Sequence, residues 1–263
     1  MKHKYLTAVS FSGVGCVLLL RALQLLTLID GSTGFGKVGR EYTGLNITVY
    51  LITGLVAVAI FVLTSFFSKR QPVSAPDMSL SPSLSVFCFI MVLYHLFGVG
   101  AYLLSGKEIT TTFGALYLIF LSVSIVFYIL YGISGFSPVK FPKLLSVAPV
   151  LLCGYNLISA FIGYTGMANI SDSIYECIFL CLALFFFLLH GKVISSVEIR
   201  RSARMILPTA CLMVLFGVLV AVAPLVTALL GGVSVLHTSP ITTLSALFPT
   251  AYALAFTLNL YKK

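Results

Sequence analysis

Among the polar residues within the long apolar runs of this sequence, five have side chains that stand out as able to bind a solute. They are Arg21, Gln24, His95, Asn156 and Glu176. Polar side chains at lipid depth are costly, and they usually face the interior of a helix bundle or a cavity. The pattern therefore predicts a binding site for a small solute between helices. It assigns no catalytic residue and no metal ligand.

Arg21 and Glu176 are the pair with the most definite chemistry. Arg21 precedes Asp30, at the end of its apolar run, by roughly 13 Å of helix. Glu176 lies one turn into another run that begins at the same side of the membrane. Because a guanidinium fork fits a carboxylate, we predict that the two side chains pair in the outer half of the bundle, directly or through water. Gln24, His95 and Asn156 would then line the space beneath the pair.

Each of these residues also has a purely structural interpretation. Arg21 can extend to the outer headgroups while its backbone stays in the membrane. Ser173 and Glu176 match a capping box, so Glu176 can simply cap its own helix. His95 can be a hydrogen-bonded packing residue, and Asn156 can bridge two helices.

The composition identifies the solvent around these residues as lipid. The chain has 263 residues, of which 59% are hydrophobic and only 9% charged, and its mean hydropathy is +1.10. Soluble domains carry about 25% charged residues. A soluble fold needs polar side chains on its exposed face, and this chain has too few of them.

The apolar runs predict how many times the chain crosses the membrane. Each run is compared with the roughly 20 residues that span a bilayer. The runs are continuous and lack two-residue alternation, which favours helices over barrel strands. We therefore predict an all-α, polytopic transmembrane helix bundle in which residues 1–263 form a single membrane domain. It has eight spans, at about 5–29, 45–67, 84–104, 112–133, 144–164, 173–190, 205–230 and 241–261.

Lysine and arginine positions predict the orientation. With both the N-terminus and the C-terminus in the cytoplasm, twelve of the sixteen basic residues fall on the cytoplasmic side: Lys2, Lys4, Lys69, Arg70, Lys140, Lys143, Lys192, Arg200, Arg201, Arg204, Lys262 and Lys263. This bias explains most of the net charge of +9 without any nucleic acid. It also predicts an affinity for anionic lipid of the inner leaflet.

No motif indicates an enzyme or a cofactor. The sequence holds no Walker, kinase, Rossmann or HExxH pattern, so we predict no cofactor and no enzymatic activity. Cys177 and Cys181 lie one turn apart, but no further Cys or His follows nearby to complete a metal site.

Two stretches resemble a known group of proteins. Arg21–Phe35 is similar to the end of the first helix in uncharacterised multi-span proteins of Gram-positive anaerobic bacteria. Asn169–Glu176, followed by Phe185–Phe187 and Arg200–Arg204, resembles the same group. The resemblance implies a multi-pass protein of the bacterial plasma membrane, and it implies no specific function.

Three functions from different classes are open at this point, and an intramembrane enzyme ranks last because the sequence has no recognisable nucleophile–base or metal motif. The first is transport or binding of a small solute in a cavity between helices. The prolines Pro149, Pro208, Pro224 and Pro249 favour it, because prolines kink helices and free backbone groups for coordination. The alternative is a sensory or scaffold subunit, which would act through a cytoplasmic protein bound at the basic stretch Lys192–Arg204.

Overall fold

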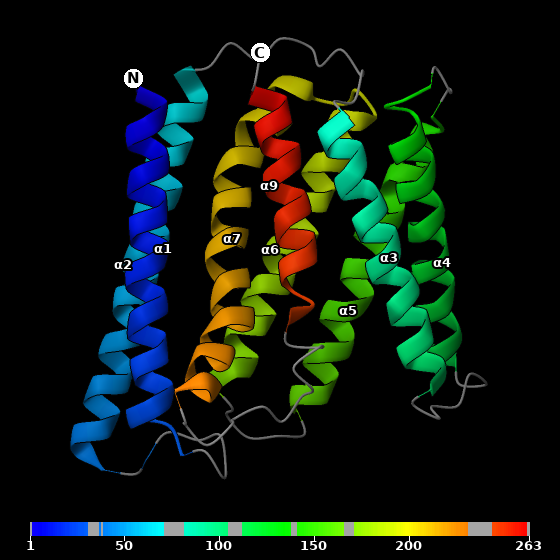
Figure 1. The fold of residues 1–263 in the computed structure, drawn as a ribbon. Coiled ribbons are helices and arrows are strands. Elements are labelled where there is room, and N and C mark those ends of the chain that lie inside the picture. The colour runs from blue at the N-terminus through cyan, green and yellow to red at the C-terminus, as the bar shows by residue number, and fades with distance from the viewer. Residues whose placement is uncertain are drawn as a thin grey trace.

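The computed structural model is an all-α bundle with one short 3₁₀ helix among the helices of its described part (Figure 1). It describes residues 2–30, 37, 39–70, 82–104, 112–137, 141–165, 171–230 and 244–261. Within them the helices are α1 (Lys2–Thr27), α2 (Arg40–Arg70), α3 (Pro82–Leu104), α4 (Thr112–Ile133), η1 (Lys143–Val147), α5 (Ala148–Thr165), α6 (Ser171–Ile194), α7 (Ile199–Leu229) and α9 (Leu247–Tyr261).

The chain is a multi-span integral membrane protein. Six of the helices, α2 to α7, are long and apolar enough to cross a membrane. The part of α1 from Ser12 to Thr27 is apolar but shorter, and α9 has 15 residues, about 22 Å of helix. Each of the eight predicted spans falls on one of these helices, which confirms the predicted fold class; residues 241–243 of the last span lie outside the described residues.

The helix ends differ from the predicted spans for identifiable reasons. Hydropathy marks only the apolar run. Helix α6 continues past its run to Ile194, and α7 begins before its run at Ile199, so both helices include basic residues. The fifth span begins as the 3₁₀ helix η1 instead of an α-helix. Pro149 has no N–H to donate to the carbonyl of Leu145, so an α-helical turn cannot form there.

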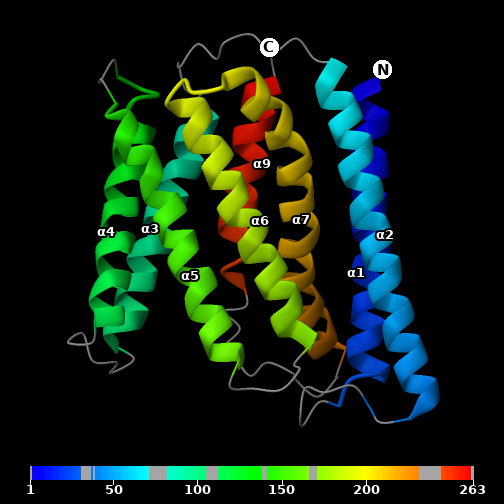
Figure 2. The same ribbon diagram turned by 180° about the vertical axis from the view of Figure 1, so that it is seen from behind.

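Successive helices alternate in direction, so α1 begins and α9 ends at the same end of the bundle (Figure 1). We call this end the terminal end, and the opposite one the distal end. The connection between α6 and α7 lies at the terminal end, and the connection between α1 and α2 lies at the distal end (Figures 1 and 2).

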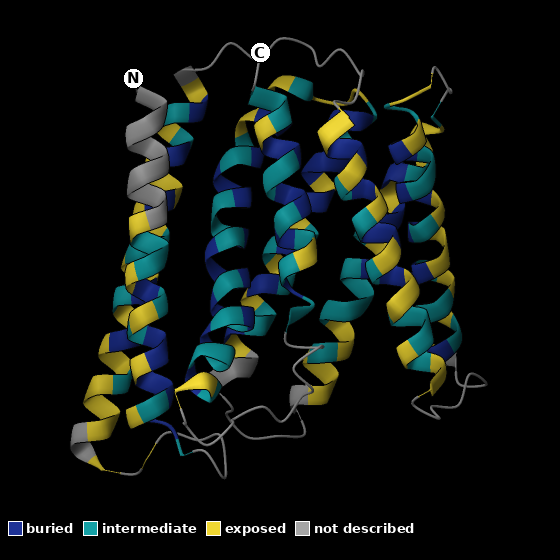
Figure 3. Cartoon of the chain, viewed as in Figure 1, coloured by how far each residue is buried: buried dark blue, intermediate teal, exposed yellow. Residues whose placement is uncertain are grey.

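Helix α7 occupies the centre of the bundle. It packs against α1, α2, α6 and α9, while α3 packs on α4 and α9, and α5 lies between α4 and α6 (Figure 2). Most of α7 is buried or half-buried, whereas α2 exposes many apolar side chains toward lipid (Figure 3). Gly217 allows α9 to approach α7, because a Cβ at this position would overlap the Thr250 hydroxyl.

A proline explains how α7 is tied to two other helices at the terminal end. Pro208 lies inside α7 and cannot donate to the carbonyl of Arg204, one turn earlier. The hydroxyl of Ser68 on α2 donates to that carbonyl at 2.6 Å. The hydroxyl of Tyr261 on α9 donates to the carbonyl of Ala203 at 2.6 Å and lies 2.9 Å from the Ser68 hydroxyl. We call these contacts the Pro208 clasp.

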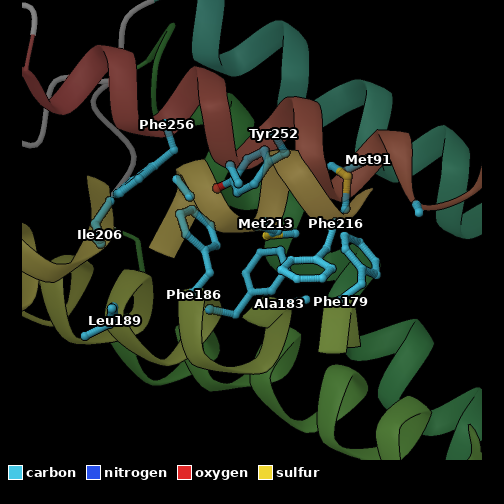
Figure 4. Close-up of a cluster of buried hydrophobic side chains, with 14 of the residues drawn as sticks. Met91, Phe179, Ala183, Phe186, Leu189, Ile206, Met213, Phe216, Tyr252 and Phe256 are labelled. Carbon is cyan, nitrogen blue, oxygen red and sulfur yellow. The ribbon is translucent and has the colours of Figure 1, made fainter. Parts of the chain in front are cut away.

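The core is strongly aromatic between α4, α6 and α9. Phe186 and Phe187 of α6, Phe127 and Tyr128 of α4, and Tyr252 of α9 are all at most 1% exposed. Figure 4 shows Tyr252 and Phe256 of α9 beside Phe186. Rings of this size fill the space between helices at the density that protein interiors require.

Candidate functional site

One face of α1 points into the bundle and the opposite face points toward lipid. On the lipid side, Leu19 and Leu23 are 66% and 56% exposed. The inward residues recur at spacings of three and four, as one face of a helix requires; they are Val17, Arg21, Gln24, Leu25 and Leu28. The helix thus carries Arg21 into the bundle within an otherwise mainly apolar stripe.

Arg21 is only 1% exposed, and its neighbours connect α1 to α2. Its Nη1 donates to Oε1 of Gln24 at 2.6 Å, and Nε2 of Gln24 donates to Oδ1 of Asn46 on α2 at 2.9 Å. The guanidinium therefore lies within the protein. This burial contradicts the alternative in which the side chain extends to the outer headgroups.

An aromatic ring from α6 completes the surroundings of this arginine. Cζ of Arg21 lies 4.6 Å from the ring centroid of Tyr175, and Tyr175 stacks on Tyr50 of α2 with centroids 5.8 Å apart. A desolvated cation over a tyrosine face gains about 2 kcal/mol. We call Arg21, Gln24, Asn46 and Tyr175 the Arg21 centre; it joins α1, α2 and α6.

The Arg21 centre lies in the distal part of the bundle, close to a second cation. Arg21 is about 9 Å along the axis from Thr27, where α1 ends. Nζ of Lys37 donates to the carbonyl of Thr27 at 2.8 Å, and the backbone N–H of Lys37 donates to the carbonyl of Leu28 at 2.8 Å. A lysine is favourable at a helix C-terminus. Two basic side chains, Arg21 and Lys37, thus lie toward the distal end of α1.

The structure does not gather all five predicted residues in one place. Glu176 is half-buried and directly follows Tyr175, whose ring the Arg21 guanidinium contacts. His95, on α3, contacts the rings of Tyr94 and Tyr128 at 5.1 and 5.4 Å between centroids. Nδ1 of His95 has no hydrogen-bond partner among the described residues.

Asn156 is also remote from Arg21 along the fold. It is half-buried on α5, which packs against α4, α6 and η1. The predicted capping of α6 by Ser173 rests on a side chain outside those that the structure describes. Thus Arg21 and Gln24 are bonded to each other, while His95 and Asn156 belong to other helix interfaces.

The sequence reasoning missed a second buried polar centre, at His190. It treated His190 only as the end of the sixth span, but α6 continues to Ile194 and His190 is 0% exposed. Its Nε2 lies 2.8 Å from the hydroxyl of Tyr252 on α9. The signal in the sequence was a histidine one turn after Phe185–Phe187, on the helix face that carries Phe186 and Phe187.

The basic stretch Lys192–Arg204 forms the turn between α6 and α7 at the terminal end. Ser196 and Glu198 have the left-handed φ values of 64° and 48°, which non-glycine residues rarely adopt. Nζ of Lys192 lies 3.1 Å from Oε2 of Glu198, and Nζ of Lys143 donates to Ser196 at 3.2 Å. The hydrogen bond and charge of Lys192 lower the pKa of the Glu198 carboxyl. Contacts from both sides thus hold the turn in one conformation.

The described side chains include no cluster of three or more His, Cys, Asp or Glu residues with the geometry to hold a metal ion. No protein-family model, no curated protein and no solved structure matches this chain. The resemblance to multi-span proteins of Gram-positive anaerobes therefore stays a prediction, and the coarser result, a multi-span helical membrane protein, stands on the structure.

Proposed function

We propose that this protein binds a small anionic solute at the Arg21 centre and moves it across a bacterial plasma membrane. The observation that carries the proposal is the burial of Arg21, which is 1% exposed inside a membrane-spanning bundle. An arginine at lipid depth costs about 3 kcal/mol on insertion scales, whereas a leucine would pack there at no such cost. Such residues mark solute and ion pathways in membrane proteins.

The chemistry of the centre favours a carboxylate or phosphate group. A guanidinium binds either of them in a planar, two-pronged geometry, and Lys37 at the distal end of α1 adds positive charge on the way in. The stacked rings of Tyr50 and Tyr175 lie beside the cation and make its surroundings apolar. We propose that Glu176 holds Arg21 while the site is empty and releases it to the solute. In this scheme the protein acts by binding and not by catalysis.

A ligand panel tests this proposal with the purified protein in nanodiscs. Small carboxylates and phosphate esters are screened by thermal shift against the wild type, Arg21→Lys and Arg21→Gln. The proposal predicts that at least one anion raises the unfolding temperature of the wild type, and that neither variant responds to it. Arg21→Lys is the sharper control, because it keeps the charge and loses only the planar fork. Equal stabilisation of all three proteins, or a panel without any response, would contradict the proposal.

The second candidate is a subunit that acts through a cytoplasmic partner at the α6–α7 turn. The favouring observation is that this turn is fixed by Lys143 and Glu198 while Arg200, Arg201 and Arg204 remain exposed. A rigid basic surface fits an acidic protein or the headgroups of anionic inner-leaflet lipid. Pull-down with wild type and an Arg200→Ala, Arg201→Ala double variant distinguishes this function: only a partner lost from the double variant supports it.

A further inference from the structure

We propose that His190 is a proton-binding site, and that protonation at Nδ1 loosens the packing of α9 against α4 and α6. The site lies at the terminal end of the bundle, far along the fold from the Arg21 centre, and the proposal does not depend on the solute that Arg21 binds. Three observations support it. The imidazole is enclosed by other side chains, its Nε2 lies at hydrogen-bond distance from Tyr252, and its Nδ1 has no hydrogen-bond partner among the described residues.

Six aromatic rings enclose the imidazole. Their centroids lie 4.4 to 6.0 Å from that of His190, and the ring of Phe256 is the nearest. The rings come in pairs from α4, α6 and α9, and belong to Phe127, Tyr131, Phe186, Phe187, Tyr252 and Phe256. His190 itself is 0% exposed. Because the enclosure is this close, a proton is the ligand that fits at His190 without displacing a side chain.

The two ring nitrogens have different surroundings. Nε2 lies 2.8 Å from the Tyr252 hydroxyl, and Nδ1 has no hydrogen-bond partner within the described part of the chain. A neutral imidazole that donates from Nε2 and leaves Nδ1 bare satisfies this arrangement. Protonated Nδ1 would be a buried donor without an acceptor, which costs far more than a bare nitrogen lone pair. The present packing therefore fits the neutral ring alone.

The groups around His190 supply no compensating charge among the residues that the structure describes. The titratable side chains that contact it are Tyr131 of α4 and Tyr252 of α9. Next to Tyr252 lie Tyr128 of α4 and Cys88 of α3. All of them are uncharged near neutral pH. On α6 itself the next charged residue is Lys192, which pairs with Glu198 at the surface. Aromatic faces attract a cation, but they do not accept a hydrogen bond as a carboxylate does.

Polar groups lie between His190 and the terminal surface, beginning one residue after His190 on α6. His190 lies about 6 Å along the axis from Ile194, the last residue of α6. The hydroxyl of Ser146 lies 3.5 Å from the carbonyl of Gly191, the residue after His190. Ser146 also lies 3.0 Å from the hydroxyl of the half-buried Ser195. A small opening between α9 and α6 would bring water to Nδ1, and the protonated ring would stabilise that opening.

Tyr252 gives protonation a structural consequence. Its hydroxyl joins His190 on α6 to α9, and it also hydrogen-bonds the thiol of Cys88 on α3. When His190 becomes charged and hydrated, the hydrogen bonds by which the Tyr252 hydroxyl joins the three helices are disturbed. We expect the terminal half of α9 to exchange its amide protons faster as a result.

Histidine NMR combined with hydrogen exchange tests the proposal on the full chain in nanodiscs. The ¹⁵N signals of His190 are assigned by their loss in His190→Asn. The proposal predicts that they report a change from the neutral to the charged ring as the pH is lowered from about 8 to about 4. After correction for intrinsic rates, exchange in α9 rises over the same pH range. This rise is absent from His190→Asn and present in His95→Asn, the matched change at the other histidine that the structure describes as buried.

Tyr252→Phe provides an independent readout, because it keeps the ring and removes the hydroxyl. Loss of this hydrogen bond, which is stronger to the charged ring, moves the His190 midpoint to lower pH by about one unit, or about tenfold in proton affinity. The proposal is overturned if His190 stays neutral across the whole range. It is also overturned if the exchange of α9 keeps its pH dependence in His190→Asn, or if Tyr252→Phe leaves the midpoint in place.

Discussion

The Pro208 clasp gives a prediction for Ser68→Ala whose magnitude depends on the proline. Ser68→Ala removes the donor to the Arg204 carbonyl, and Pro208 cannot replace it because it has no N–H. Ser68 is 0% exposed and its hydrogen bond to the carbonyl is partly buried, so the carbonyl loses its partner where water has limited access. An unsatisfied buried acceptor costs about 1–3 kcal/mol, whereas hydrogen bonds between membrane helices average about 0.6 kcal/mol in double-mutant cycles. We expect Ser68→Ala to destabilise the protein by about 1–2 kcal/mol.

In a Pro208→Ala background the same change is nearly neutral. The substituted alanine supplies an N–H that donates to the Arg204 carbonyl within α7, as in any α-helix. The cost of Ser68→Ala then falls to below about 0.5 kcal/mol, so the two changes are coupled by about 1 kcal/mol. Thr64→Val is the matched control: Thr64 is 0% exposed and lies one turn away on α2, but its hydroxyl donates to the carbonyl of Ile60 in its own helix.

Unfolding is followed by circular dichroism, because the chain has no tryptophan whose fluorescence could report it. The four proteins of the Ser68 and Pro208 cycle are compared in one detergent with the Thr64→Val pair. The reasoning is refuted if Ser68→Ala costs as much in the Pro208→Ala background as in the wild type. It is also refuted if Thr64→Val shows the same coupling to position 208.

Three further predictions follow from the placement of single residues. Arg21→Met and Glu176→Gln should each lower the unfolding temperature, because each single change leaves a charge without its partner. The double variant should lose much less than the sum of the two losses, and additive losses would contradict the predicted pair. Gly217→Ala should destabilise the bundle through overpacking against α9, by about 1–3 kcal/mol, and an unchanged unfolding temperature would contradict this close approach. Reporter fusions after Arg204 should report cytoplasm and those after Lys107 the outside; the opposite result would reverse the predicted orientation.

The sequence was sufficient for the fold class because lipid imposes a simple rule on it. Every backbone group in the membrane must be bonded within its own segment, so each long apolar run becomes a helix. The fourth span was predicted at 112–133, and α4 runs from Thr112 to Ile133. The start of α5 was harder, because Pro149 shifts the preceding turn to a 3₁₀ helix without changing the hydropathy.

The candidate site was predictable only where the signal lies in one helix. Arg21 and Gln24 stand out because they are polar positions on the inward stripe of α1, and they are bonded to each other. Asn46 and Tyr175 belong to the same centre, but their positions depend on how α2 and α6 are aligned beside α1. A single sequence does not record that alignment, so these two residues were not found.

The prolines also show that a single sequence does not record which helices lie side by side. They were predicted to free backbone groups for coordination, and Pro208 does free the carbonyl of Arg204. The partner of this carbonyl is Ser68 of the same chain. Pro149 and Pro249 lie in the first turns of α5 and α9, where a helix tolerates proline.

The central claim is that the buried Arg21 recognises an anionic solute. Identifying the solute that co-purifies with the protein tests this claim most directly. The wild type and Arg21→Met are purified under identical mild conditions, and small molecules released on unfolding are identified by mass spectrometry. The account predicts a carboxylate or phosphate compound in near-stoichiometric amount from the wild type, and its loss by at least about tenfold from Arg21→Met, because the guanidinium contact is worth about 1.5–3 kcal/mol. The same compound recovered equally from both proteins, or a compound without an anionic group, would contradict it.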